Sequence, residues 1–316
     1  MMYLYKRLAL ILSAAVWLGF VSSCSGDLPE GETRLKKVDF QNIVQQGDKE
    51  AEKAKKRTLK IAVAAMISPK YTYDYYVELL NLIAEQMGCD VEFIQKKTYA
   101  QVNEMLRQRE LDMAFVCSGP YVTGRDDFGL DILVVPVSHG KKVYHSYFIV
   151  NKDSAIRSLD QLRGKTFAFT DPHSNTGCLV PNFVLARRGE TPETFFKETF
   201  FSNSHDNSIK AVAEGLADGA AVDSLIWEFM NMVNPEITKR TKIIEKSPPY
   251  GIPPVVVHPS MDEPTKNKFR NIFLGIHKHP KGKEILSRLQ IDRFEPGNDA
   301  DYDTVREMQR WIASRH

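Results

Sequence analysis

From Thr58 onward, short apolar segments alternate with segments whose apolar residues recur at helical spacing. Leu59–Ile67 is a nearly continuous apolar run, as expected of a strand that is buried on both faces. Tyr75–Met87 has apolar residues at helical spacing and ends at Gly88, a favoured residue at helix C-termini. Strands that alternate with helices of this length predict βαβ units, parallel sheets and an α/β fold.

The same alternation continues to the end of the chain. Thr98 followed by Gln101 is a capping box, which predicts the start of a helix. From about Asp262 the sequence is expected to be entirely helical. Further segments predicted as strands are Val91–Ile94, Met113–Cys117, Ile132–Val137, Thr166–Thr170, Ala220–Val222 and Pro254–Val257.

The order of these elements predicts two lobes. The β-rich stretch Val143–Val150 is expected to cross from one lobe to the other, and a second crossing is expected near residue 250. We therefore predict a first lobe over residues 58–145 and a second lobe over 146–248. Residues 249–316 are expected to return to the first lobe and to form the C-terminal helices. Two lobes joined by two crossing strands leave a cleft between them.

The N-terminus has the pattern of an export signal. Lys6 and Arg7 form a short basic region, and Leu8–Val21 is uncharged and apolar. This run is shorter than the roughly 20 residues that span a bilayer, but it suits a secretory signal. Residues 1–23 are therefore predicted to be a signal peptide.

The residues that follow predict a lipid anchor. Val21-Ser22-Ser23-Cys24 resembles the lipobox of bacterial lipoproteins, in which the cysteine is lipidated and becomes the new N-terminus. Acyl chains on Cys24 would hold the protein at a membrane surface. Residues 24–57 are then a polar tether that begins with the lipidated cysteine. The alternative is a short hydrophobic N-terminal helix that happens to contain a cysteine.

Composition and charge limit the classes of partner. Hydrophobic residues make up 43% of the chain, which is ordinary for a globular protein. The chain has 42 Lys and Arg against 40 Asp and Glu, and removal of Lys6 and Arg7 leaves 40 of each. A neutral chain without a long basic block does not predict binding to nucleic acid.

One segment combines several features of an anion site. After the predicted strand Thr166–Thr170, the chain turns through Asp171-Pro172 and brings Ser174, Asn175 and Thr176 to the start of a helix. Helix N-termini expose unpaired N–H groups that attract anions, and serine and threonine hydroxyls add further donors. The alternative is an ordinary helix cap, since these residue types are the usual N-caps.

The segment also resembles a family signature. Asp171-Pro-x-Ser-x-Thr-Gly177, followed by Leu179-Val-Pro181, is similar to the motif of the phosphate-, phosphite- and phosphonate-binding proteins of ABC importers. The resemblance extends over about residues 58–290. It implies a type II periplasmic-binding-protein fold with ligand in the cleft between the lobes. The other matching segments are Phe115–Val122, Ser204–Val212, Asp218–Ser224 and Ser247–Pro254.

The resemblance also implies a set of binding residues. Asn175 stands where the best-known members of the family carry a hydroxyl residue. Asp223 falls on the acidic position that contacts the protonated or amine end of the ligand. The cradle for the anion falls on Ser174, Asn175 and Thr176, with His205 facing it and with Ser118, Tyr121 and one of Tyr71 or Tyr73 on the first lobe.

The function implied is that of a lipid-anchored binding protein that captures phosphonate, phosphite or phosphate and presents it to an ABC permease. No cofactor, no metal site and no enzymatic activity are expected. One alternative is a ligand-sensing module that works with a sensor kinase. Another is a hydrolase that uses Ser174, His205 and Asp223, although no Gly-x-Ser-x-Gly motif surrounds Ser174.

Overall fold

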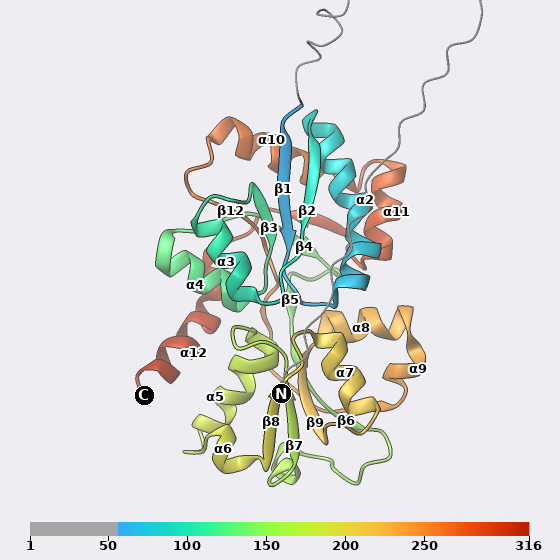
Figure 1. The fold of residues 1–316 in the computed structure, drawn as a ribbon, viewed down its shortest axis with the longest axis vertical. Helices are drawn as coiled ribbons and strands as arrows, with labels where there is room; N and C mark the ends of the chain where they lie inside the picture. Colours follow the sequence, from blue (N-terminus) through green and yellow to red (C-terminus); the bar gives the residue numbers. More distant parts are fainter. Residues whose placement is uncertain (1–55, 316) are drawn as a thin grey trace, which may run out of the picture. The chain divides into compact units, whose positions relative to one another are not determined.

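The computed structural model describes residues 56–315, and the predicted signal peptide, Cys24 and nearly all of the predicted tether lie outside them. The described residues form two main β-sheets and one short strand pair (Figure 1). The six-stranded sheet has the order β13 (Arg293–Glu295), β4 (Asp131–Val137), β12 (Val255–Val257), β3 (Met113–Phe115), β1 (Thr58–Val63) and β2 (Asp90–Ile94). The five-stranded sheet has the order β10 (Thr241–Lys246), β6 (Ser146–Asn151), β9 (Gly219–Asp223), β7 (Thr166–Phe169) and β8 (Glu198–Phe201).

Each sheet has a parallel part and an antiparallel part. In the first sheet β1 pairs in parallel with both β2 and β3, while β12 lies antiparallel between β3 and β4. In the second sheet β7 pairs in parallel with β8 and β9, and β6 lies antiparallel between β9 and β10. The first sheet therefore combines strands from before residue 138 with strands from after residue 254.

Two crossings join the sheets. The short strands β5 (Val143–Tyr144) and β11 (Tyr250–Gly251) pair with each other in antiparallel orientation between them, Tyr144 opposite Tyr250. This arrangement confirms the predicted α/β fold with two lobes and two crossing strands.

Helices cover both sheets (Figure 1). The first lobe carries α2 (Pro69–Met87), α3 (Tyr99–Arg107), α4 (Ser118–Phe128), α10 (Glu263–Ile276) and α11 (Pro280–Arg288). The second lobe carries α5 (Val180–Ala186), α6 (Pro192–Phe195), α7 (His205–Ala213), α8 (Ser224–Val233) and α9 (Pro235–Thr238). Short 3₁₀ turns cover Leu159–Leu162 and Asp299–Tyr302. Within residues 56–315, no helix combines the length and the apolar character that crossing a membrane requires.

Helix starts follow the local chemistry of the sequence. The capping box predicted from Thr98 and Gln101 is confirmed, since the Thr98 side chain accepts the backbone N–H of Gln101 and the Gln101 side chain accepts that of Thr98. The helix expected over Tyr75–Met87 begins earlier, at Pro69, because a proline is accommodated in the first turn. It ends at Gly88, as expected, in the left-handed conformation that glycine adopts readily.

The C-terminal region is not entirely helical, and that expectation was wrong. Residues Arg293–Glu295 form β13, which pairs antiparallel with β4 at the edge of the first sheet. Phe294 lies between two charged residues and is 1% exposed, and its ring contacts that of Phe273 edge to face at 4.8 Å. This polar, apolar, polar alternation over three residues is too short to distinguish a strand from a loop by sequence alone.

The last helix, α12 (Asp303–Ala313), contacts both lobes. It packs against α4 of the first lobe and α5 of the second. Trp311 of α12 meets Phe183 of α5 edge to face, with ring centroids 5.2 Å apart. The C-terminal helix therefore adds a third connection between the lobes beside the two crossing strands.

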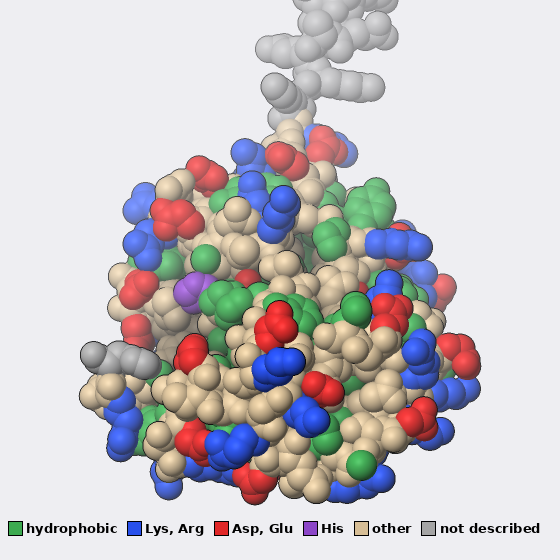
Figure 2. Space-filling view, turned by 60° about the horizontal axis from the view of Figure 1, so that its bottom comes forward, with side chains coloured by type: hydrophobic (Ala, Val, Ile, Leu, Met, Phe, Trp, Pro, Cys, Tyr) green, Lys and Arg blue, Asp and Glu red, His purple; other side chains and the backbone are tan. Residues whose placement is uncertain are grey.

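Charged side chains of both signs are mixed on the surface that Figure 2 presents. Lysines and arginines on this face are interspersed with aspartates and glutamates and do not gather into one basic field (Figure 2). This is the distribution expected from the balanced charge of the sequence.

Candidate functional site

The segment after β7 forms a wide helical turn. Residues Asn175–Leu179 are π-helical and continue directly into α5. Pro181 has no N–H to donate to the Gly177 carbonyl, and that carbonyl instead accepts the backbone N–H of Thr170 at 3.1 Å. The proline thus explains why a regular helix does not begin here, and the widened turn is joined to the end of β7.

Gly177 allows this turn to lie against its neighbours. A Cβ atom at position 177 would stand 2.3 Å from the Thr170 hydroxyl oxygen and 3.0 Å from Cε1 of His205. The Ser174 side chain caps the turn by accepting the backbone N–H of Gly177 at 3.0 Å. The turn is therefore closely packed, and its first residues face His205.

Two polar atoms of the turn are buried without an internal partner. Asn175 and Thr176 are both 0% exposed. The Asn175 amide nitrogen donates to the Tyr144 hydroxyl at 3.0 Å, but its Oδ1 and the Thr176 Oγ1 have no hydrogen-bond partner. A buried polar atom without a partner costs about 1–3 kcal/mol, so a ligand that pairs with these atoms would be bound favourably.

His205 faces the turn as a neutral imidazole. Burial lowers the pKa of His205 to about 3. Its Nδ1 accepts the backbone N–H of Asp223 at 3.0 Å, so the single proton of the neutral ring is on Nε2. Nε2 lies 3.4 Å from the Ser174 hydroxyl. His205 is therefore placed to donate a hydrogen bond beside the turn without carrying a charge.

The first lobe covers the turn from the other side. The backbone N–H of Tyr99, at the start of α3, donates to the Asp171 carboxylate at 3.1 Å across the two lobes. A Cβ on Gly119 of α4 would stand 2.4 Å from the backbone oxygen of His173, so the lobes are in close contact here. The Tyr99 hydroxyl is buried and has no hydrogen-bond partner, like those of the turn. We call Ser174–Thr176, His205 and Tyr99 together the cradle.

Further polar groups surround the cradle. Tyr144, from the crossing strand β5, is 0% exposed, and its hydroxyl lies 3.8 Å from the Cys117 sulfur. Burial raises the pKa of Cys117 to about 11 and raises that of Tyr144 well above its usual value, so both groups keep their protons at neutral pH. The Ser118 hydroxyl donates to the Gly251 carbonyl at 2.6 Å, which ties α4 to β11.

Asp223 lies next to the cradle at the end of β9. Its Oδ1 accepts the backbone N–H of Leu225 at 2.7 Å and caps α8, while its backbone N–H bonds to His205. The side chain is 1% exposed, and burial raises the pKa of Asp223 to about 7. The carboxyl group is thus poised to gain or lose a proton near neutral pH.

The three tyrosines named from the sequence lie in different environments. Tyr71 is half-buried, meets Phe229 edge to face at 6.4 Å, and lines a cavity that also contains Asp223. Tyr73 is 55% exposed and stacks on Phe93, so the structure does not bring it to the cradle. The Tyr121 hydroxyl donates to Asp299 at 2.6 Å, which holds the C-terminal segment.

The sequence did not single out Tyr99 of the cradle or its neighbour Tyr144. Tyr99 was passed over because it follows Thr98 in a capping box and reads as an ordinary first helical residue. Its helix follows the carboxyl end of β2, and in α/β sheets ligands bind outside the carboxyl ends of the strands, which is a usable signal. Tyr144 stands in a two-residue strand whose position depends on the fold of both lobes.

The hydrolase alternative does not fit this geometry. In a catalytic triad the acid accepts the Nδ1 proton of the histidine, but here Nδ1 accepts from the backbone of Asp223 and the carboxylate caps α8. A histidine whose pKa is about 3 is also a weak base at neutral pH. Among residues 56–315, no group of three histidine, cysteine or acidic side chains is placed to hold a metal ion. The arrangement is suited to binding an oxyanion through uncharged donors from both lobes.

Comparison with known proteins also indicates a substrate-binding protein. Residues 61–302 match the family described as ABC transporter, phosphonate, periplasmic substrate-binding protein. The phosphonates-binding periplasmic protein of Escherichia coli is 27% identical over 80% of this chain and 76% of its own length. A probable phosphite-binding protein of an ABC transporter from Prochlorococcus marinus is 25% identical over 72% of this chain and 80% of its own length.

A solved structure agrees in fold as well as in sequence. The binding protein component of an ABC phosphonate transporter from Pseudomonas aeruginosa superposes with a TM-score of 0.76 at 26% identity. The match covers 80% of this chain and 86% of that one. The chain therefore belongs to the family of periplasmic substrate-binding proteins of phosphonate ABC transporters, which are binding proteins and not enzymes.

Proposed function

We propose that this protein captures a small phosphorus oxyanion, namely a phosphonate, phosphite or phosphate, in the cradle and presents it to an ABC permease. The observation that carries the proposal is the set of buried, unpartnered polar atoms on Tyr99, Asn175 and Thr176, beside a turn whose Ser174 hydroxyl lies 3.4 Å from the neutral imidazole of His205. The names of the relatives support the ligand class, since one is named for phosphonates and one for phosphite.

The donors of the cradle suit a tetrahedral anion. The Thr176 and Tyr99 hydroxyls and the His205 Nε2–H belong to both lobes, so an anion that contacts all three would hold the lobes together. This is the geometry of a ligand that stabilises the closed arrangement of a two-lobed protein. Asn175 Oδ1 is an acceptor, and it would be satisfied by a P–OH group or by rotation of the amide.

Asp223 is proposed to select against sulfate. A carboxylate close to a bound anion is unfavourable unless a proton lies between them, because like charges repel strongly where water is excluded. A phosphorus oxyanion can keep a P–OH group near neutral pH, whereas sulfate is fully ionised. Burial raises the pKa of Asp223 to about 7, so this rejection should be strongest above pH 7, where the carboxyl group is ionised.

Titration calorimetry at one pH tests both parts of the proposal. We expect wild-type protein to bind methylphosphonate or phosphite and to reject sulfate, and we expect Asp223→Asn to narrow the ratio between the two affinities. Glu236→Gln, in the exposed ion pair with Lys239, is the control and should leave the ratio unchanged. Wild-type protein that binds none of the phosphorus anions would contradict the proposed ligand class. An unchanged ratio in Asp223→Asn would remove Asp223 as the selective group.

The anchoring of the protein is proposed from the sequence alone, since Cys24 lies outside the described residues. Periplasmic binding proteins of this family act outside the cytoplasm, and a lipidated Cys24 would keep this one at the membrane. Cys24→Ala is expected to move the protein from the membrane fraction to the soluble fraction. A Cys24→Ala protein that stays with the membranes after a high-salt wash would show that the lipobox interpretation is wrong.

A further inference from the structure

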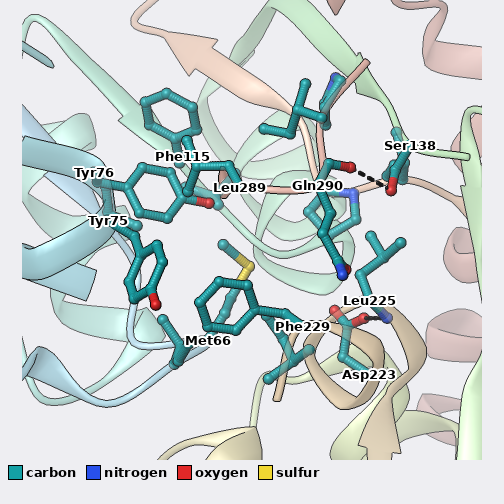
Figure 3. A pocket seen from close by; sticks show the side chains of 18 of the residues that line it. Met66, Tyr75, Tyr76, Phe115, Ser138, Asp223, Leu225, Phe229, Leu289 and Gln290 are labelled. Carbon is teal, nitrogen blue, oxygen red and sulfur yellow. Dashed lines mark hydrogen bonds between the residues drawn. The ribbon is translucent and has the colours of Figure 1, made fainter. Parts of the chain in front are cut away.

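A cavity of about 90 Å³ lies between the two lobes beside the cradle. Tyr75, Tyr76 and Phe115 line it from α2 and β3 of the first lobe, and Leu225 and Phe229 line it from α8 of the second. Figure 3 shows these side chains arranged around a common space, with the aromatic rings of both lobes turned toward it. A buried water needs about 10–15 Å³, so the cavity has room for about six waters or for a short chain of carbon atoms.

The cavity adjoins the cradle through two lining residues that are hydrogen-bonded to His205. Asp223 gives its backbone N–H to His205 Nδ1 at 3.0 Å, and its side chain lines the cavity. Met66 accepts the backbone N–H of His205 at 3.0 Å, and its side chain also lines the cavity. Asp223 and Met66, which Figure 3 shows at the cavity, therefore connect it to His205 of the cradle.

The lining is apolar and carries no basic side chain. Asp223 is the one acidic residue among the lining residues, and none of them is lysine, arginine or histidine. The Ser138 hydroxyl is already used, since it donates to the backbone oxygen of Gln290 at 2.8 Å. Burial raises the pKa of Tyr76 to about 12, which reflects poor solvation of charge on this side of the cavity. A charged group placed here would lose water without gaining a partner beyond Asp223.

We infer that this cavity holds the organic substituent on phosphorus, and that its lining selects phosphonates with an uncharged hydrocarbon substituent of several carbons over inorganic phosphite and phosphate. The inference rests on the proposed function, because it requires the phosphorus oxyanion to sit in the cradle. Aromatic and aliphatic side chains from both lobes would close on such a substituent, so its burial would favour the closed arrangement together with the contacts of the anion.

A ligand series with constant headgroup tests the cavity directly. Phosphite, methylphosphonate, propylphosphonate and pentylphosphonate have the same oxygens and differ in the length of the substituent. Each buried methylene contributes about 0.8 kcal/mol, which is about fourfold in affinity, so propylphosphonate should bind at least tenfold more tightly than methylphosphonate. Affinity that stays flat or falls from methyl to pentyl in calorimetric titrations would overturn the inference.

Charged substituents of matched size test the selectivity. 3-Phosphonopropionate places a carboxylate near Asp223 and should bind at least tenfold more weakly than butylphosphonate. 2-Aminoethylphosphonate has the size of propylphosphonate but carries an ammonium group, and it should bind more weakly than propylphosphonate. Tighter binding of the amino compound would mean that the Asp223 carboxylate and not the apolar lining selects the ligand, and the inference would be wrong.

A filling substitution locates the effect in the cavity. Leu225→Phe adds volume next to Asp223 and should weaken propylphosphonate at least tenfold while leaving phosphite within twofold. Leu216→Phe is the matched control, because Leu216 is 67% exposed and is not among the lining residues. Leu289→Phe fills the cavity from the first lobe and replaces Leu225→Phe if that variant does not fold. Equal losses for phosphite and propylphosphonate would contradict the inference.

The outcomes separate this inference from the proposed function. Binding of phosphite and methylphosphonate without tighter binding of longer substituents would support the proposed function and contradict the inference about the cavity. Binding of no member of the series would contradict the proposed function as well.

Discussion

Thr176 combines full burial with a hydroxyl that has no partner inside the protein. Thr176→Val keeps the shape of the side chain and removes that hydroxyl, so the free energy of unfolding of the ligand-free protein should stay equal or rise. Ligand affinity should fall about tenfold or more, because hydrogen bonds to charged groups contribute about 1.5–3 kcal/mol. Chemical denaturation and calorimetry measure the two effects.

Thr72 provides the opposite case as a control. Its hydroxyl is buried but donates to the Ile67 carbonyl at 2.9 Å. Thr72→Val should therefore lower the free energy of unfolding by about 1 kcal/mol or more and leave the ligand affinity unchanged. If Thr176→Val behaves like Thr72→Val, the Thr176 hydroxyl serves the fold and not the ligand.

Gly177 is predicted to be required at its position. In Gly177→Ala the new methyl group would meet the hydroxyl and the Cβ of Thr170, which directly follows β7, so both stability and ligand affinity should decrease. Gly275→Ala is the control, because a Cβ there meets nothing within 4 Å and alanine favours the α10 helix. Thermal unfolding should show a lower melting temperature for Gly177→Ala and a slightly higher one for Gly275→Ala. A Gly177→Ala protein as stable as wild type would show that the turn can adjust.

The sequence pointed to Ser174, Asn175, Thr176 and His205 of the cradle, but not to Tyr99 or to the neighbouring Tyr144. Ser174 and Thr176 follow a predicted strand and precede a helix, so local chemistry was enough to single them out. Tyr99 and Tyr144 reach the same place from α3 and β5. For Tyr99 the one local signal is its place after the carboxyl end of β2, and the surroundings of Tyr144 in the sequence carry none. Tyr73 was named with Tyr71, but the helix that carries both turns Tyr73 toward solvent and Phe93.

At the level of elements, the close approach of α4 to the cradle turn gives a prediction about lobe closure. A Cβ on Gly119 would stand 2.4 Å from the His173 oxygen of the other lobe, so Gly119→Ala should hinder closure without disturbing either lobe alone. We expect weaker ligand binding and a smaller ligand-induced decrease in the radius of gyration, measured by small-angle scattering. The free energy of unfolding of the ligand-free protein should also decrease, because the lobes already make this contact in the structure. Unchanged closure would mean that α4 moves aside.

The predicted elements were most accurate where they were long or sharply capped. The strand β1 and the helix α3 were identified because continuous burial and a capping box are local signals. The strand β13 was missed because three residues carry too little periodicity, and its pairing with β4 depends on segments more than 150 residues apart. The contact of α12 with both lobes could not be predicted from local pattern either, because the helices that it contacts are brought together only when the whole chain has folded.

For the whole molecule, two buried groups give opposite dependences of stability on pH. The pKa of Asp223 is raised from 3.8 to about 7, so the stability it contributes is present at low pH and is lost as pH rises through about 7. The pKa of His205 is lowered from 6.5 to about 3, so its contribution is present above 6.5 and is lost as pH falls toward 3. Between about pH 4 and 6.5 the two partly cancel.

Asp223→Asn separates these contributions and can keep the cap on α8, because asparagine is also a favoured N-cap. The free energy of unfolding of the variant, taken relative to that of wild type, should rise between about pH 4 and about pH 7 and stay constant above pH 7. Denaturation curves at several pH values between 4.5 and 8 measure this. Parallel curves for the two proteins would show that Asp223 keeps an ordinary pKa in the folded state.

The cradle that we propose as the ligand site offers hydroxyls and a neutral imidazole whose Nδ1 is bonded to the backbone of Asp223. These groups are fixed dipoles without net charge, so the binding of an anion does not require the release of counterions from them. Dissolved salt at 0.1 M screens charges separated by more than about 10 Å, but it screens short, buried hydrogen bonds between two lobes much less. A phosphorus oxyanion would consequently be held with nearly the same affinity in dilute and in concentrated salt solution, whereas a site built from exposed lysines would lose its ligand as the salt concentration rises.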